Sequence, residues 1–242
     1  MKNLLFYWFR GGSTLIQGLI TDRNVCPEPK GNWTPTRNGQ FLLSEPPYSC
    51  ISEDAQYLRK PGYVYPPYEH LLYRAHIGDQ VLVPPRLVEI LKPDSIVMLC
   101  RDGRNQIESM RNMKGGAGWK RSQQNRQKFF CDAANGFRRR VEFAQDLKEK
   151  YGERFSIVRM EDLLENPFSI VASIFDFWGI RPDTSAILEH ISNIMPDQNS
   201  TLEHSSFKSI KGINCRWHAW SDDEKRMFNE IAGESLRYLG YE

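Results

Sequence analysis

Three short stretches of the chain are apolar almost without interruption, and they constrain its fold more than any other feature of the sequence. They are residues 4–9 (LLFYWF), 96–100 (IVMLC) and 155–158 (FSIV). A strand with one face in water alternates apolar and polar residues, whereas a continuous apolar run requires cover on both faces. We therefore expect these stretches to be buried strands of a parallel sheet.

Helical patterns lie between and after these strands. From residue 121 to 151 apolar side chains recur every three or four positions, which predicts one long helix that ends at Gly152. A second helix is predicted over residues 168–178, and a third begins at Ser221, where Glu224 completes a capping box. Strands that alternate with helices predict a three-layer α/β fold, in which helices flank a central parallel sheet.

A chain of 242 residues can bury a substantial core, and we expect a single domain over residues 1–242. Residues 27–67 differ from the rest, because they contain most of the prolines, many aromatic side chains and no sustained periodicity. Long irregular segments of compact domains are commonly lids or binding loops. We interpret this stretch as an irregular lobe or lid that contacts substrate, with a plain packed connection as the alternative.

Charge and cysteine content argue against several classes of protein. Thirty-two Lys and Arg oppose thirty Asp and Glu, and a net charge of +2 provides no field that would attract a nucleic acid. The five cysteines form no CxxC pair, which fits neither a zinc site nor a disulfide framework and favours a reducing, cytoplasmic location. The apolar run at residues 4–9 is too short for a signal peptide or a membrane span. We expect no metal site, no nucleic-acid partner and no membrane span.

The first segment that could bind a ligand is residues 10–14 (RGGST), between the first predicted strand and a helical pattern. Glycines permit a tight turn in which successive N–H groups converge at a helix N-terminus, where the helix dipole favours an anion. Arg10 adds a cation, and Ser13 and Thr14 add hydroxyl donors. The segment lacks the Gly-Lys-Ser/Thr ending of a Walker A loop. It predicts a phosphate site, with a plain connection as the alternative.

Two further segments follow the same logic. Arg101 stands at the carboxyl end of the second predicted strand, the edge at which open α/β sheets bind ligands. Ser109 comes eight residues later, about two turns along a helix that starts near Gly103. Lys211-Gly212 lies in a loop before the capping box and suits a backbone and amine that close over a phosphate. A solvated turn with an ion pair is the alternative for the segment at Arg101.

Together these segments resemble the sulfotransferases that use 3′-phosphoadenosine 5′-phosphosulfate (PAPS). Residues 10–15 (RGGSTL) are similar to that family's R-S-G-[ST]-T-L loop, and Arg101 with Ser109 is similar to its R-[DN]-P-x5-S pattern. Residues 158–180 resemble its Y-E-D-L…P…F-L-G-[LI] segment, and Lys211-Gly212 followed by Trp217 resembles its C-terminal loop. The matches keep the family's order along the chain. Three positions depart from it: Gly11 for serine, Gly103 for proline and Met160 for tyrosine.

The resemblance implies a three-layer P-loop-type fold and an enzyme that transfers a sulfuryl group from PAPS to an acceptor hydroxyl. The 10–15 loop would contact the 5′-phosphosulfate, with Arg10 also stabilising the transferred group, and Arg101 and Ser109 would contact the 3′-phosphate. The residues that the resemblance assigns to PAPS are Arg10, Gly11, Gly12, Ser13, Thr14, Leu15, Arg101, Ser109, Lys211 and Gly212.

The acceptor hydroxyl needs a base, and Glu28 is the candidate. Its spacing after Arg10, in the segment Cys26-Pro27-Glu28-Pro29, resembles the G-E-P segment of bacterial trehalose sulfotransferases. This match favours a carbohydrate or other polyol as acceptor, in the form of a small molecule or a glycan. His70 and His76 are the alternative bases, and an exposed turn is the alternative for Glu28.

Two other functions stay open at this stage. One is a P-loop kinase that acts on a small molecule, which the missing Walker A lysine disfavours. The other is a non-catalytic nucleotide-binding relative that kept the fold, which the departures at Gly11 and Met160 would suit.

Overall fold

The computed structural model describes residues 2–8, 16, 34–35, 41–44, 70–77, 88–89, 92–112, 117–179 and 216–242. Its described strands form one sheet in the order β2-β3-β4-β1-β5-β6, in which every pair is parallel except β2 with β3. The strands are β1 (Lys2–Trp8), β2 (Thr34–Pro35), β3 (Phe41–Ser44), β4 (His70–Ile77), β5 (Ser95–Cys100) and β6 (Phe155–Arg159). The described helices are α3 (Gly103–Asn112), α4 (Ala117–Gln124), α5 (Arg126–Tyr151), η4 (Gly152–Arg154), α6 (Met160–Glu165), α7 (Pro167–Phe177), η5 (Arg216–Ala219) and α10 (Asp222–Tyr238).

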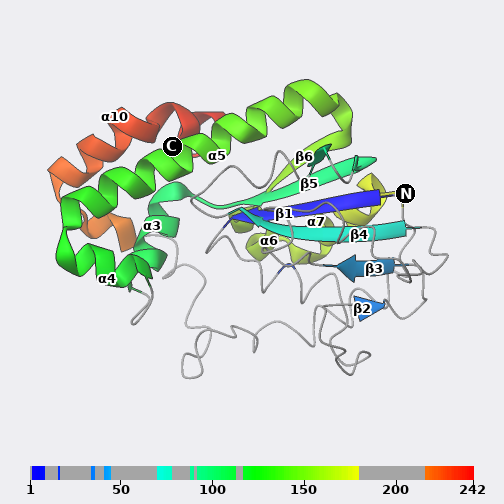
Figure 1. The fold of residues 1–242 in the computed structure, drawn as a ribbon, viewed down its shortest axis with the longest axis horizontal. Coiled ribbons are helices and arrows are strands. Elements are labelled where there is room, and N and C mark those ends of the chain that lie inside the picture. Colours follow the sequence, from blue (N-terminus) through cyan, green and yellow to red (C-terminus); the bar gives the residue numbers. More distant parts are fainter. Residues whose placement is uncertain are drawn as a thin grey trace.

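Helices cover both faces of the sheet, as the apolar runs require (Figure 1). Successive residues of a strand point to opposite faces. In β1, Phe6 and Trp8 pack in the cluster beneath α5 and α10, whereas Leu5 and Tyr7 pack in the cluster with α6 and α7. Figure 1 shows α5 and α10 side by side along one face. The predicted three-layer arrangement is confirmed.

The three predicted strands are confirmed as β1, β5 and β6, with Phe9 outside the described residues. The predicted helix over residues 121–151 is wrong in one respect, because Asn125 divides it into α4 and α5. Asn125 is extended, with φ −152°, and its side chain accepts a hydrogen bond from the Lys128 N–H. Asparagine competes with helical backbone by this local bond and so caps a new helix.

Two strands lie within the stretch that was predicted to be irregular. β2 and β3 fall inside residues 27–67 and extend the sheet beyond β4. Both are four residues long or less, too short to show a period in the sequence. β4 was also not predicted, although it pairs with β1 along seven positions. The rest of residues 27–67 lies outside the described residues. The role of this stretch as a lid therefore stays a prediction.

Both predicted helix ends are confirmed. Gly152 ends α5 with φ +57°, a conformation that costs a glycine little, and its N–H donates to the carbonyl of Lys148. Ser221 begins α10 with both hydrogen bonds of the capping box to Glu224.

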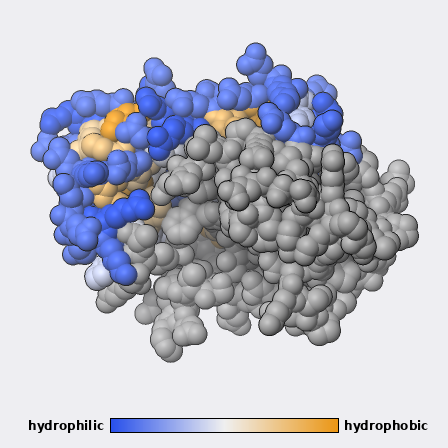
Figure 2. Space-filling model, in the orientation of Figure 1, coloured by the Kyte–Doolittle hydropathy of each residue, from blue (hydrophilic) through white to orange (hydrophobic). Residues whose placement is uncertain are grey.

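The described surface is mainly polar. Among the residues that Figure 2 colours, hydrophilic ones predominate and apolar ones show in small areas. Tyr238 is the one large apolar side chain that is exposed among the described residues. Of the helices that the structure describes, none has the length and apolar character needed to cross a membrane.

Candidate functional site

The predicted site begins where β5 ends and α3 begins. Asp102 caps α3: its carbonyl accepts from the Gln106 N–H (2.9 Å) and its Oδ1 accepts from the Arg104 N–H (2.8 Å). The Arg104 guanidinium folds back onto the same carboxylate, with Nε at 3.0 Å from Oδ1 and Nη2 at 2.7 Å from Oδ2. These local bonds fix the turn that carries Arg101.

Arg101 and Ser109, the two residues predicted to contact the 3′-phosphate, both belong to this unit. Arg101 follows the last residue of β5 and is 7% exposed, and Ser109 is half-buried on α3. The helix starts at Gly103, as predicted, so that Ser109 stands about 9 Å along its axis. The structure therefore places a guanidinium and a hydroxyl on one short strand-to-helix unit at the carboxyl edge of the sheet.

The departure at Gly103 has a structural reason. A Cβ built on Gly103 would lie 2.6–2.8 Å from three ring carbons of Phe137 on α5. The Phe137 ring is fully buried, and it packs edge-to-face on Trp8 at 5.4 Å between ring centroids. No residue with a Cβ, proline included, fits at position 103 beside this ring without a shift. Met160, the departure at the third motif, opens α6 and packs partly buried against the second core cluster.

Glu161 connects the strand-to-helix turn to the C-terminal end of the chain. Its Oε1 accepts from the Asp102 N–H (3.2 Å), and its Oε2 accepts from the Tyr241 hydroxyl (2.6 Å). Burial is the main cause that raises the pKa of Tyr241 far above its usual value, and the neighbouring Cys100 and Glu161 raise it further. The phenol therefore stays protonated and keeps donating to the carboxylate.

Arg159, the last residue of β6, bonds to both α6 and the C-terminal end of the chain. It makes a two-pronged ion pair with Asp162 (2.8 and 2.6 Å) and donates to the carbonyl of Gly240 (3.0 Å). The hydrogen bond that Arg159 donates to Asp162 is the main cause that raises the pKa of Arg159. Cys100 is in register with Arg159, and burial raises the pKa of its thiol to about 12.

A second network ties α3 to the segment that follows the predicted Lys211-Gly212 loop. Glu108, next to Ser109, is 3% exposed and accepts from the indole N–H of Trp220. It also pairs with Arg111 at 3.0 Å. Trp220, the residue that follows η5, is thereby bonded to the helix that carries Ser109.

Glu224 continues this network at the start of α10. Burial alone would raise the pKa of this carboxyl, but the hydrogen bonds from Arg126 (2.6 and 2.9 Å) and from the Ser221 backbone, with the charge of Arg111, outweigh it, so that the net pKa is lowered. Glu224 is thus held ionised between α10 and α5.

The remaining predicted site residues lie outside the described residues. They are Arg10, Gly11, Gly12, Ser13, Thr14, Leu15, Glu28, Lys211 and Gly212. β1 ends beside β5, with Tyr7 in register with Leu99, so the chain leaves both strands at one edge of the sheet. Ile16, which follows the predicted loop, is helical and fully buried in the second core cluster.

The two alternative bases lie on β4. His70 is the first residue of that strand, in register with Phe41, and His76 is next to its last residue, in register with Tyr7. Because β4 is parallel to β1 and β5, His70 stands at the amino edge of the sheet, opposite to Arg101, and His76 stands near the carboxyl edge.

Glu161, Glu108 and Tyr241 have contacts that the sequence motifs did not predict. Each acts through a partner 59 to 112 residues away along the chain, and no local pattern signals such a contact. Among the residues that the structure describes, no group of three His, Cys, Asp or Glu is placed to hold a metal ion.

Comparison with known proteins identifies what the chain is similar to. The model of the sulfotransferase domain family matches residues 72–237. No curated protein matches the sequence at a significant level.

Three solved structures share the fold at low sequence identity. Mouse sulfotransferase SULT7A1 complexed with PAP is 13% identical, with a TM-score of 0.59 over 98% of this chain and 84% of that one. The sulfotransferase domain from the curacin biosynthetic pathway is 16% identical, with a TM-score of 0.58 over 100% and 99%. Retinol dehydratase in complex with androsterone and PAP is 16% identical, with a TM-score of 0.50 over 97% and 80%.

Proposed function

The chain belongs to the sulfotransferase domain family, and from this premise we propose that it transfers a sulfuryl group from PAPS to an acceptor hydroxyl. The observation that carries the proposal is the strand-to-helix unit at the carboxyl edge of the sheet. It presents the buried guanidinium of Arg101 and the hydroxyl of Ser109. PAP, the product of PAPS, is bound in two of the similar structures.

The residues present suit a nucleotide with a 3′-phosphate. A guanidinium donates to two phosphate oxygens at once, and a helix start offers backbone N–H groups beside it. Arg101 and Ser109 would hold the 3′-phosphate, and the loop at residues 10–15 with Lys211 and Gly212 would hold the rest of the phosphates. PAPS, when bound, supplies the sulfuryl group.

This chain's own residues have three tasks in such a transfer. Sulfuryl transfer should resemble phosphoryl transfer, in which an enzyme mainly aligns the reactants and neutralises oxygens. Arg10 and the amides of residues 11–14 would neutralise the moving group without a divalent cation. Glu28 would accept the proton of the acceptor hydroxyl. If Glu28 is not the base, the sheet geometry favours His76 over His70.

For the acceptor we propose a carbohydrate or other polyol, as a small molecule or a glycan. The Glu-Pro segment at Glu28 supports this choice, and the aromatic side chains of residues 27–67 could stack on sugar faces. The five cysteines without a CxxC pair support a reducing, cytoplasmic location for the reaction.

The donor site can be tested by calorimetric titration with PAP and with adenosine 5′-phosphate. Because Arg101 is expected to contact only the 3′-phosphate, Arg101→Ala should weaken PAP binding by about tenfold or more. The affinity for adenosine 5′-phosphate should stay nearly unchanged. Arg138→Ala, which removes an exposed arginine on α5, is the matched control. Equal losses for both ligands with an intact circular dichroism spectrum would remove Arg101 from this role.

The reaction itself separates the three candidate functions. Incubation with PAPS and a mixed panel of polyols, phenols and sterols, followed by mass spectrometry, should show an added sulfuryl group on one acceptor class. A transfer of phosphate from ATP that requires magnesium would favour the kinase. Tight PAP binding with no product from any acceptor would favour the non-catalytic relative.

The proposed base has its own test. Glu28→Gln should leave PAP affinity intact and lower kcat by roughly 10²–10⁴-fold, with a smaller effect on KM. A turnover close to that of the unaltered protein would exclude Glu28, and His76→Gln would be the next variant to measure.

A further inference from the structure

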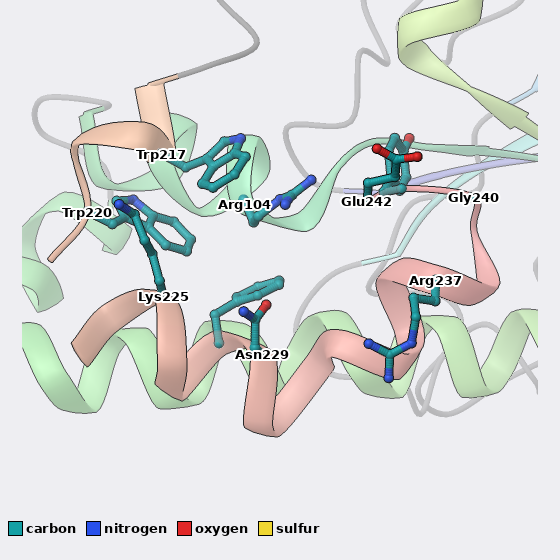
Figure 3. A pocket seen from close by; sticks show the side chains of 10 residues that line it. Arg104, Trp217, Trp220, Lys225, Asn229, Arg237, Gly240 and Glu242 are labelled. Carbon is teal, nitrogen blue, oxygen red and sulfur yellow. The ribbon is translucent and has the colours of Figure 1, made fainter. Parts of the chain in front are cut away.

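A cavity of about 770 Å³ lies between α3, η5, α10 and the C-terminal residues. Its size falls within the range of sites for small organic ligands. Figure 3 shows α10 along one side and the start of α3 with η5 along the other. Its lining includes Arg104, Trp217, Trp220, Lys225, Phe228 and Asn229. None of them is a residue assigned above to the nucleotide or to the acceptor.

The side formed by α10 is polar and positive. Lys225 and Asn229 are four residues apart and so share one face of the helix, and Arg237 lines the cavity about two turns further along. Lys225 is half-buried, and its nearest carboxylate, Asp222, is 4.0 Å away and fully exposed. Within the described part of the chain, no ion pair is formed by Arg237.

The opposite side is a rigid aromatic and cationic surface. The Arg104 guanidinium lies over the Trp217 ring, 4.0 Å from its centroid, and is held there by Asp102. Figure 3 shows Arg104 beside Trp217, with Lys225 reaching from α10 toward Trp220. The aromatic rings and the ammonium group of Lys225 therefore meet at the same end of the cavity.

Buried aromatic rings form the back of this end. Trp220 and Phe228 are 3% and 1% exposed, with 5.7 Å between their ring centroids. Trp220 is locked by its hydrogen bond to Glu108. The cavity thus offers a preformed apolar wall, which lowers the entropic cost of binding a flat ligand.

We propose that this cavity is a second ligand site, which binds a small aromatic anion. Asp102 neutralises Arg104, and the other two cations of the lining, Lys225 and Arg237, face one side-chain carboxylate, Glu242, so an anion is favoured. The ring of the ligand stacks against Trp217, and its anionic group lies at Lys225 and Asn229. Aryl sulfate esters, one product class of a sulfotransferase, belong to this chemical class, but the binding itself does not depend on the proposed function.

The test is calorimetric titration with 2-naphthyl sulfate and with its uncharged counterpart 2-naphthol. The sulfate should bind more tightly than the naphthol, and Lys225→Gln should remove about threefold to fivefold of that advantage. Arg226→Gln makes the same charge change on the neighbouring residue, which does not line the cavity, and should change nothing. Asn229→Trp places a bulky ring on an exposed position of the lining and should abolish binding of both ligands.

Titration in saturating PAP locates the ligand independently. Binding that persists in PAP and is lost in Asn229→Trp supports the second site. Displacement by PAP would assign the anion to the nucleotide site, and equal affinities in Lys225→Gln and Arg226→Gln would refute the role of Lys225. If PAP itself does not bind, the proposed function fails, but the α10 variants still decide this proposal.

Discussion

Gly103→Ala is the substitution that most directly tests how the site is packed. The added Cβ would lie 2.6 Å from Cδ2 of Phe137, where carbon atoms in contact are normally about 3.5–4.0 Å apart. The ring cannot easily retreat, because Phe137 is fully buried between Trp8 and Phe228. Roughly 1 Å of space must therefore come from a shift of α3 or of α5.

The expected cost follows from two opposing effects. Overpacking of a rigid core costs about 1–3 kcal/mol, and replacing glycine by alanine in a helix returns up to about 1 kcal/mol. Gly103→Ala should thus lower the free energy of unfolding by about 1–2 kcal/mol, or the melting temperature by roughly 2–8 °C in a protein of this size. Urea unfolding followed by circular dichroism measures the loss.

A double-mutant cycle isolates the cause. Phe137→Leu should remove the clash, so that Gly103→Ala costs little in that background and the coupling free energy is about 1 kcal/mol or more. Gly233→Ala is the matched control, because its Cβ would meet nothing closer than 3.6 Å and the change should be neutral or stabilising. If Gly103→Ala behaves like this control, or costs the same with Leu at position 137, the steric explanation is wrong.

Three further predictions concern the networks around the site. Tyr241→Phe removes the hydroxyl that donates to Glu161 and should lower the free energy of unfolding, measured in urea, by about 1–2 kcal/mol. The same variant should bind PAP severalfold more weakly in a calorimetric titration. Unchanged values in both assays would contradict the role of Tyr241 in holding the turn. The folded pKa of Glu224 lies below its unfolded value of 4.5, so the stability that its ionised form contributes is present above pH 4.5 and is lost as the pH falls through the folded pKa. The difference in unfolding free energy between the unaltered protein and Glu224→Gln, measured by urea unfolding, should therefore shrink toward zero from pH 7 to pH 3. A difference that stays constant with pH would contradict this prediction. With a pKa of about 12, the Cys100 thiol is ionised to only about one part in three thousand at about pH 8.5. Iodoacetamide should therefore leave Cys100 unmodified under conditions that alkylate the partly exposed Cys131, as measured by peptide mass spectrometry.

The parts of the fold that could be predicted are those that neighbouring residues encode. The apolar runs identified β1, β5 and β6, and the Ser221 capping box and Gly152 identified two helix ends. Each of these signals is complete within a few positions of the chain. β3 and β4 were missed because their strand character depends on pairing, of β4 with β1 and of β3 with β4, and not on a periodic pattern of their own.

The candidate site divides in the same way. The positions of Arg101 at the end of a strand and of Ser109 on the following helix could be predicted, because they follow from element boundaries. The reason for Gly103 could not be predicted, since it is set by a ring 34 residues later on a different helix. Residue 103 is a glycine because of Phe137, and the sequence alone gives no indication that the two positions are in contact.

The order of the strands explains why two separate motifs act as one unit. β5 and β6 are adjacent and parallel, with Cys100 in register with Arg159, so the residues that follow each strand emerge side by side at the same edge. The Asp102 N–H therefore meets the Glu161 carboxylate directly, although 59 residues separate them in the chain. The Tyr241 hydroxyl donates to the other oxygen of that carboxylate, so the C-terminal residues also help to position the turn that carries Arg101. The turn before α3 is held by Glu161 at the start of α6 and by the C-terminal residues as well as by its own cap, and a substitution at Glu161 should consequently alter the position of Arg101 through the Asp102 backbone.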